Sequence, residues 1–181
     1  PKPGTIFPTA APQSLGMSLL PFLVASMLPW AAAGEQQFDA VAVPPTMGAW
    51  VAGKGFEASY PTPKPGDLHA KFGGLPSDCE VLVKVAASSV NPADQLATQG
   101  VMGSDLSGTV VEMGNGCANS RLSVGTAVWG DIGAVAHFNT PFQNKTKENG
   151  AYAEFSAALD SQLGVKPKNV DFVEAGALPK V

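Results

Sequence analysis

From residue 80 onward, hydrophobic residues occur in short runs that are rich in β-branched side chains. Residues 80–85 (EVLVKV) and 108–114 (GTVVEMG) are typical of strands. The alternation is imperfect and glycines interrupt it, which predicts a curved antiparallel barrel whose closure needs bulges. The pattern also predicts strands at 151–158 and 163–166, a loop at 131–149, and a helix at 171–177 with Asp171 as its N-cap.

A long apolar stretch precedes this pattern. Residues 15–34 carry no charge, and a run of about twenty mainly apolar residues matches the length of a helix that spans a membrane, although Pro21 and Pro29 interrupt it. Three interpretations stay open: a membrane-spanning helix, which we favour, an arm packed on a partner protein, and a targeting peptide with a small-residue site at 31–33. The sequence thus predicts an extended leader at 1–14, a hydrophobic segment at 15–34, a linker at 35–46 and a folded domain at 47–181.

Composition narrows the class of protein. Twenty glycines and sixteen prolines favour a turn-rich β architecture over a helical bundle. A net charge of −4 argues against a nucleic-acid partner, because binding to phosphates requires a basic surface. Cys79 and Cys117 are too far apart in sequence for a metal-binding motif, and we favour two ordinary thiols over a disulfide.

Polar residues separate the two strongest strands. Residues 88–94 (SSVNPAD) follow the strand at 80–85, and polar side chains at the rim of a sheet commonly form sites. The ordered series VNPAD (90–94), GSDLSG (103–108) and VVEMG (110–114) resembles the medium-chain dehydrogenase/reductase superfamily, and within it the zinc-free quinone oxidoreductase (ζ-crystallin-like) branch. The resemblance continues through VGTAVWG (124–130) and GAYAEF (150–155) to EAGALP (174–179).

The resemblance implies a mainly β fold. We expect a GroES-like, partly open antiparallel β-barrel with short helices over 47–181. The opening strand of the family corresponds to 47–52, and the second strand of its first hairpin corresponds loosely to 66–72.

The resemblance also implies candidate site residues. Asn91 and Asp94 match an Asn-x-x-Asp loop that borders the nicotinamide while hydride passes between cofactor and substrate. A purely structural role is the alternative for both, because Asn before Pro favours a turn and Asp94 suits the cap of a short helix. Asp105 matches a recurrent acidic position, and a buried turn residue explains it equally well. We interpret Tyr152 as architectural.

Zinc chemistry is not expected. Zinc-dependent relatives carry a histidine where this chain has Ser104 and a cysteine at the position of Val90-Asn91, and two cysteines cannot form a site that needs four. His69 and His137 lie outside every matched motif and are expected to be surface or packing residues.

Two functions fit the sequence. Family enzymes continue into a Rossmann domain that binds NADPH, and no strand, glycine-rich turn and helix follow one another here, so we expect no dinucleotide on this chain alone. The first hypothesis is the N-terminal half of an NADPH-dependent, zinc-independent quinone oxidoreductase-like enzyme. The second is a non-catalytic accessory subunit of a photosynthetic or respiratory complex in a plastid or mitochondrial membrane, anchored by 15–34, with other subunits covering its exposed interdomain face.

Overall fold

The computed structural model describes residues 40–68, 78–97, 99–133 and 147–179, all within one compact unit, Phe38–Val181. The strands are β1 (Thr46–Val51), β2 (Gly55–Pro61), β3 (Glu80–Ala87), β4 (Gln99–Val101), β5 (Asp105–Met113), β6 (Ala127–Asp131), β7 (Lys147–Asn149), β8 (Phe155–Leu159) and β9 (Gly164–Val165). The helices are the 3-10 turns η1 (Pro92–Leu96), η2 (Asn115–Cys117) and η3 (Asp160–Gln162), and the α-helix α2 (Phe172–Ala177).

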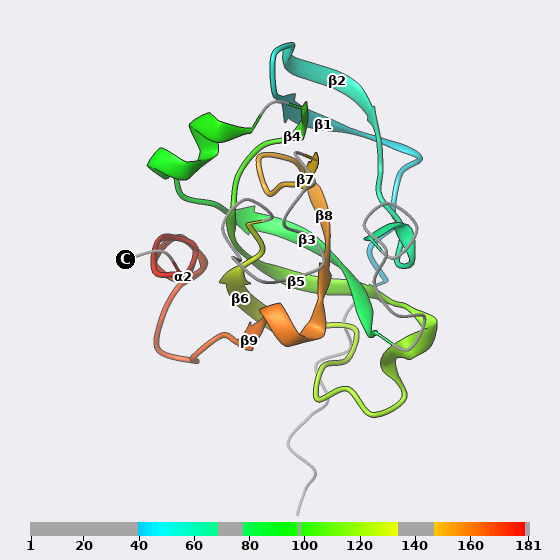
Figure 1. Cartoon of the computed structure of the whole chain (residues 1–181). Coiled ribbons are helices and arrows are strands. Elements are labelled where there is room, and N and C mark those ends of the chain that lie inside the picture. The colour runs from blue at the N-terminus through cyan, green and yellow to red at the C-terminus, as the bar shows by residue number, and fades with distance from the viewer. Residues whose placement is uncertain (1–39, 69–77, 98, 134–146, 180–181) are drawn as a thin grey trace, which may run out of the picture. The chain divides into compact units, whose positions relative to one another are not determined.

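Two sheets contain these strands. Their strand orders are β2-β1-β4-β7 and β8-β3-β5-β6-β9 (Figure 1). Neighbouring strands are antiparallel except β4 and β7, which are parallel. The register of β3 against β5 shifts twice along the pair, which confirms the predicted bulges. The predicted mainly β fold with short helices is therefore confirmed.

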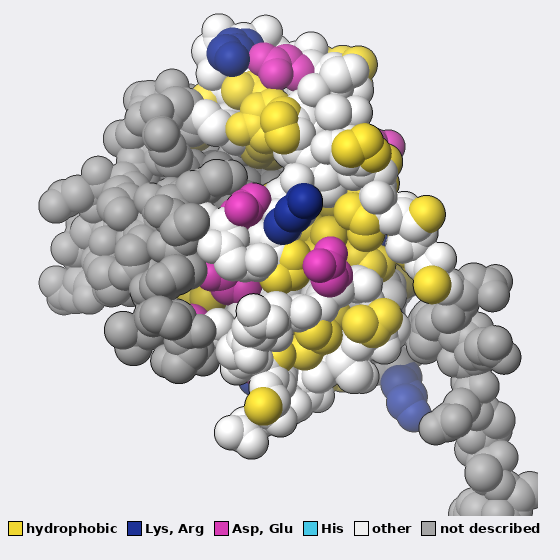
Figure 2. All heavy atoms as spheres, turned by 90° about the vertical axis from the view of Figure 1, so that its right-hand side faces the viewer, with side chains coloured by type: hydrophobic (Ala, Val, Ile, Leu, Met, Phe, Trp, Pro, Cys, Tyr) yellow, Lys and Arg dark blue, Asp and Glu magenta, His cyan; other side chains and the backbone are white. Residues whose placement is uncertain are grey.

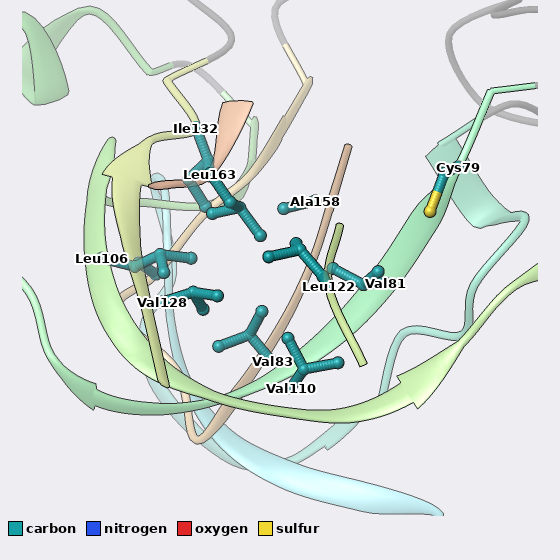
Figure 3. Packing of buried hydrophobic residues seen from close by; sticks show 11 residues of the cluster. Cys79, Val81, Val83, Leu106, Val110, Leu122, Val128, Ile132, Ala158 and Leu163 are labelled. Atoms are coloured by element: carbon teal, nitrogen blue, oxygen red, sulfur yellow. The ribbon is translucent and has the colours of Figure 1, made fainter. Parts of the chain in front are cut away.

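The first half of strand β3, residues 80–83, is buried on both faces. Val81 and Val83 belong to the cluster that fills the concave side of the larger sheet, where Leu106, Val110, Val128 and Leu163 point toward them (Figure 3). Leu82, between the two valines, packs instead with Met47, Val51 and Phe155. Since successive side chains on a strand point to opposite faces, this double burial explains why 80–85 is an almost continuous apolar run.

The segment before β8 joins the two sheets. Tyr152 N donates to Met102 O at 2.8 Å, and Tyr152 O accepts from Trp50 N at 2.7 Å. Two residues later, Glu154 N donates to Gly48 O at 3.1 Å and Glu154 O accepts from Val85 N at 2.9 Å. The predicted strand at 151–158 therefore begins only at Phe155, because the residues before it form bonds to both sheets.

The second strand of the first hairpin is β2, so its predicted place at 66–72 is wrong. A turn with Gly53 at φ 74° and Gly55 at φ 85° reverses the chain directly after β1. Residues 66–68 instead form a turn held by Glu80, whose Oε2 accepts from Gly66 N at 2.6 Å and Leu68 N at 3.0 Å. Residues 69–72 lie outside the described residues.

The C-terminal predictions are largely confirmed. Helix α2 begins after Asp171, whose Oδ1 accepts from Glu174 N at 2.7 Å, and Glu174 Oε2 accepts from Asp171 N at 3.1 Å. The predicted short strand at 163–166 is β9. Both ends of the predicted loop at 131–149 are strands instead, because β6 includes Asp131 and β7 covers Lys147–Asn149, and residues 134–146 lie outside the described residues.

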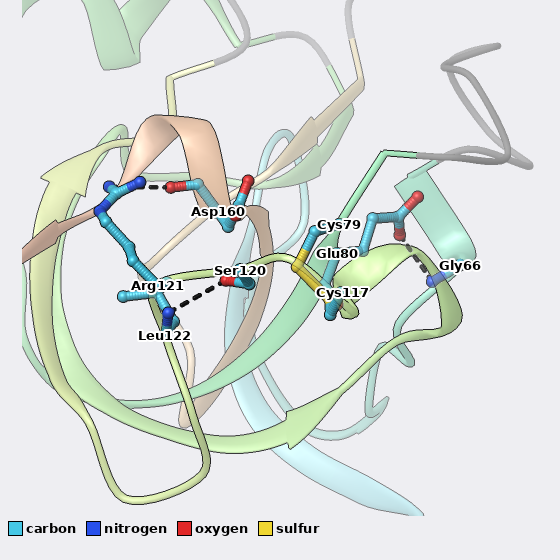
Figure 4. Close-up of a disulfide and its surroundings, with 8 residues drawn as sticks. All are labelled: Gly66, Cys79, Glu80, Cys117, Ser120, Arg121, Leu122 and Asp160. Carbon is cyan, nitrogen blue, oxygen red and sulfur yellow. Dashed lines mark hydrogen bonds between the residues drawn. A yellow bond between two sulfur atoms is a disulfide. The ribbon is translucent and has the colours of Figure 1, made fainter. Parts of the chain in front are cut away.

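The expectation of two ordinary thiols is wrong, because Cys79 and Cys117 form a disulfide (Figure 4). Val81 pairs with Met113 across β3 and β5, and the η2 turn that follows β5 brings Cys117 back to the beginning of β3. Strand pairing thus brings together two residues that are 38 positions apart.

The surface carries exposed apolar side chains in several separate groups on the face that includes the β1–β2 hairpin (Figure 2). On this hairpin, Trp50 pairs with Phe56, and their side chains are 51% and 63% exposed. Across the described ranges, no helix has the length and apolar character needed to cross a membrane. Residues 15–34, the predicted membrane helix, lie outside the described residues.

Candidate functional site

The polar segment after β3 folds back onto the beginning of β5. Ser88 Oγ donates to Asp105 O and Ser89 Oγ donates to Asp105 Oδ2, both at 2.6 Å. Asn91 then caps the η1 turn, with Pro92 as its first residue, where the fixed φ of proline suits a helical turn. The loop is therefore anchored at both ends, by hydroxyl groups before Asn91 and by a helical turn after it.

Asp94 lies at the centre of this loop and is only 2% exposed. Its Oδ2 accepts from Asn91 N and from Tyr152 Oη, each at 2.7 Å, and its Oδ1 accepts from Ser104 Oγ at 2.9 Å. A buried carboxylate is costly unless hydrogen-bond donors surround it, and Asp94 has three. Asp94 is not the N-cap of η1, since Asn91 occupies that position and the Asp94 carboxylate accepts from the backbone N–H of Asn91.

Asn91 contacts several hydroxyl and carboxylate oxygens through its side-chain nitrogen. Nδ2 lies 2.8 Å from Asp105 Oδ2, 3.0 Å from Ser89 Oγ and 3.4 Å from Ser104 Oγ. These contacts fix the plane of the amide, and Asn91 remains only half-buried. Among the predicted residues, Asn91 is thus the one that is both fixed and accessible.

Asp105 is completely buried at the start of β5. Its Oδ2 carries the bonds from Ser89 and Asn91, whereas Oδ1 has no hydrogen-bond partner among the residues described. The interpretation of Asp105 as a buried, hydrogen-bonded residue agrees with this geometry.

The site has two layers. Asp94, Ser104 and Asp105 form a buried polar layer, each with at most 2% exposure. Ser89, Asn91 and Tyr152 are half-buried and lie above it. The two buried carboxylates accept hydrogen bonds from the hydroxyl and amide groups of these half-buried residues.

Tyr152 is the member of the site that sequence reasoning missed. Its hydroxyl lies 2.7 Å from Asp94 Oδ2 and 3.1 Å from Ser89 O, although 58 positions separate Tyr152 from Asp94. Gly103 leaves space for the tyrosine ring, but it lies far from Tyr152 in sequence, so no local pattern indicated the contact. His69 and His137 lie outside the described residues.

The donor set does not fit a zinc ion. Both cysteines are held in the disulfide, so neither offers a thiolate. Ser104 uses its hydroxyl to bind Asp94, and within the described ranges no three histidine, cysteine or acidic side chains group together as metal ligands.

The described residues also contain no pyrophosphate site of the Rossmann type, in which a glycine-rich turn leads into a helix. The α-helix in these ranges, α2, is six residues long, and it follows β9 without a glycine-rich turn.

The comparisons place this chain in a known family. Residues 77–168, just over half of the chain, match the family model of the alcohol dehydrogenase GroES-like domain. The chain belongs to this family, and thereby to the medium-chain dehydrogenase/reductase superfamily.

Relatives include NADPH-dependent enzymes. The chain is 33% identical over 111 residues to the chloroplastic NADPH-dependent alkenal/one oxidoreductase of Arabidopsis thaliana, covering 55% of this chain and 27% of that protein. A mycobacterial quinone oxidoreductase structure is 26% identical with a TM-score of 0.52, covering 72% of this chain and 37% of the other.

The quinone oxidoreductase of Coxiella burnetii shares the fold. Its TM-score is 0.53 at 22% identity, covering 75% of this chain and 40% of the other. The chain thus spans well under half the length of each of these three relatives.

Proposed function

We propose that this chain forms the substrate-side domain of an NADPH-dependent, zinc-independent oxidoreductase that reduces quinones or conjugated carbonyl compounds. The observation that carries the proposal is Asn91, a half-buried residue whose side-chain amide is fixed by hydrogen bonds to buried residues of the GroES-like fold. NADPH supplies the hydride when it is bound. The task of this domain is to hold the reacting groups at a fixed distance, since small errors in placement cost large factors in rate.

The polar layer suits that task. Asp94, Ser104 and Asp105 bind one another and the loop, so the Asn91 side chain is held before a ligand arrives and little freedom is lost on binding. We infer that Asn91 contacts the nicotinamide or the substrate, whereas Asp94 acts through the loop.

Because this chain alone is not expected to bind NADPH, the test uses the full-length protein together with its cofactor domain. It measures the loss of NADPH absorbance with a benzoquinone and, separately, with an unsaturated aldehyde. Asn91→Ala is expected to lower kcat/KM by about 100-fold, the loss typical of a misplaced reacting group. The matched control is Asn119→Ala, which truncates an exposed asparagine at the end of η2 and should leave the rate unchanged. Full-length wild-type protein that binds NADPH but reduces neither substrate class, or that does not bind NADPH at all, would refute the proposal.

A second candidate function is the non-catalytic accessory subunit of a membrane complex. Val90 and Val173 are 86% and 72% exposed, and Leu178 is 48% exposed, which favours a surface covered by another protein. Titration calorimetry with NADPH separates the two candidates, because micromolar affinity in the purified protein contradicts a purely accessory role.

A further inference from the structure

The backbone of Tyr152 is held from two sides. Its N–H donates to Met102 O and its carbonyl accepts from Trp50 N, so the residue links β1 to the segment before β5. The ring lies against Gly103, where an added Cβ would come within 2.4 Å of Cδ1. Gly103 also has φ 95°, which favours glycine. Backbone bonds and a residue without a side chain therefore direct the Tyr152 hydroxyl toward the site.

The hydroxyl faces two acceptors and has one proton to donate. Asp94 Oδ2 lies at 2.7 Å and Ser89 O at 3.1 Å, and neither a carboxylate oxygen nor a carbonyl oxygen donates in return. The shorter contact, to the charged group, is the stronger one. Asp94 therefore depends on Tyr152 for one of its three donors, and the other donor to the same oxygen is the backbone N–H of Asn91.

We propose that Tyr152 is a positioning residue of this site. Its hydroxyl fixes the Asp94 carboxylate, Asp94 fixes the backbone of Asn91 and the η1 turn, and these together place the Asn91 amide at the rim. The kinetic part of this inference rests on the proposed function, whereas the structural part, the hold on the loop, does not. Tyr152 thus connects the segment that joins the two sheets to the loop that meets the ligand.

The test compares Tyr152→Phe with Tyr60→Phe. The first keeps the ring over Gly103 and removes only the hydroxyl, whereas the Tyr60 hydroxyl makes no hydrogen bond to the described residues. Amide hydrogen exchange at Asn91 is expected to become about tenfold faster in Tyr152→Phe, because a bond to a buried charge is lost, and to stay unchanged in Tyr60→Phe. With NADPH and a quinone, kcat is expected to fall about tenfold while the KM for NADPH stays within about twofold.

A third variant tests whether Tyr152 acts on Asn91 through Asp94. If Tyr152 acts by holding Asp94, adding Tyr152→Phe to Asp94→Ala, which removes the acceptor, changes neither exchange nor kcat further, since the effects of residues in one network are not additive. Unchanged exchange at Asn91 in Tyr152→Phe overturns the proposal, whatever the activity. Faster exchange with normal kcat overturns the kinetic role. Faster exchange in Tyr152→Phe, combined with no turnover by the wild type, supports the hold on the loop and refutes the proposed function instead.

Discussion

Breaking the bond between Cys79 and Cys117 is expected to lower the free energy of unfolding by about 4 kcal/mol. The bond closes a loop of 38 positions. For a loop of that length, the chain-entropy relation gives a loss of about 13 cal/mol/K in the unfolded state, or about 4 kcal/mol at room temperature. Most domains have a total stability of roughly 5–15 kcal/mol, so this bond contributes a large part of it.

The assay is urea unfolding of the oxidised protein, of the protein reduced before refolding, and of the Cys79→Ala/Cys117→Ala double variant. Reduction should lower the midpoint of the wild type and should not affect the double variant. In a thermal scan, the wild type should lose about 10–15 °C on reduction.

Two results would refute this reasoning. One is an equal midpoint for the oxidised and reduced wild type. The other is alkylation of both cysteines in the native protein before any reductant is added, because a disulfide offers no thiol to the reagent.

Three further predictions concern stability, each measured by urea unfolding. Glu80→Ala should lower the free energy of unfolding by about 2–4 kcal/mol, because two backbone N–H groups lose their acceptor. Glu57→Ala is the control, since its ion pair with Lys54 lies at the surface and contributes less than about 1 kcal/mol. Asp171→Ala should cost about 1 kcal/mol through the lost cap of α2, and no change would show that this cap contributes nothing. Gly108→Ala should lower the free energy of unfolding by about 1–3 kcal/mol, because the added Cβ would lie 2.2 Å from the carbonyl oxygen of Lys84 in β3. A variant as stable as the wild type would contradict that contact.

The features that could be predicted from the sequence are those that local chemistry determines. The run at 80–85 and the cap at Asp171 each carry their signal within a few residues, and both are confirmed. Strand β2 gave a weaker signal, because it lies at the edge of its sheet and leaves Phe56 largely exposed. Its pairing with β1 follows from the turn at 53–55 rather than from burial.

The site was predicted only as far as one loop. The series at 90–94 located Asn91 and Asp94, but the burial of Asp94 depends on Ser104 and on Tyr152, which arrives from another part of the fold. The disulfide was missed for the same reason, since the distance between Cys79 and Cys117 is set by strand pairing. Contacts between segments that are far apart in sequence cannot be predicted from the local pattern of residues.

The disulfide affects how the site forms during folding and how it responds to proteolysis. Asn91, Asp94, Ser104 and Asp105 all lie between Cys79 and Cys117, inside one covalent ring. A protease that cuts once within this ring leaves the two fragments linked, so the separation of these four residues stays limited. Tyr152 lies outside the ring and joins the site only when the chain after β7 has docked. In refolding from the oxidised unfolded state, the contact between Tyr152 and Asp94 therefore reports the arrival of the C-terminal strands.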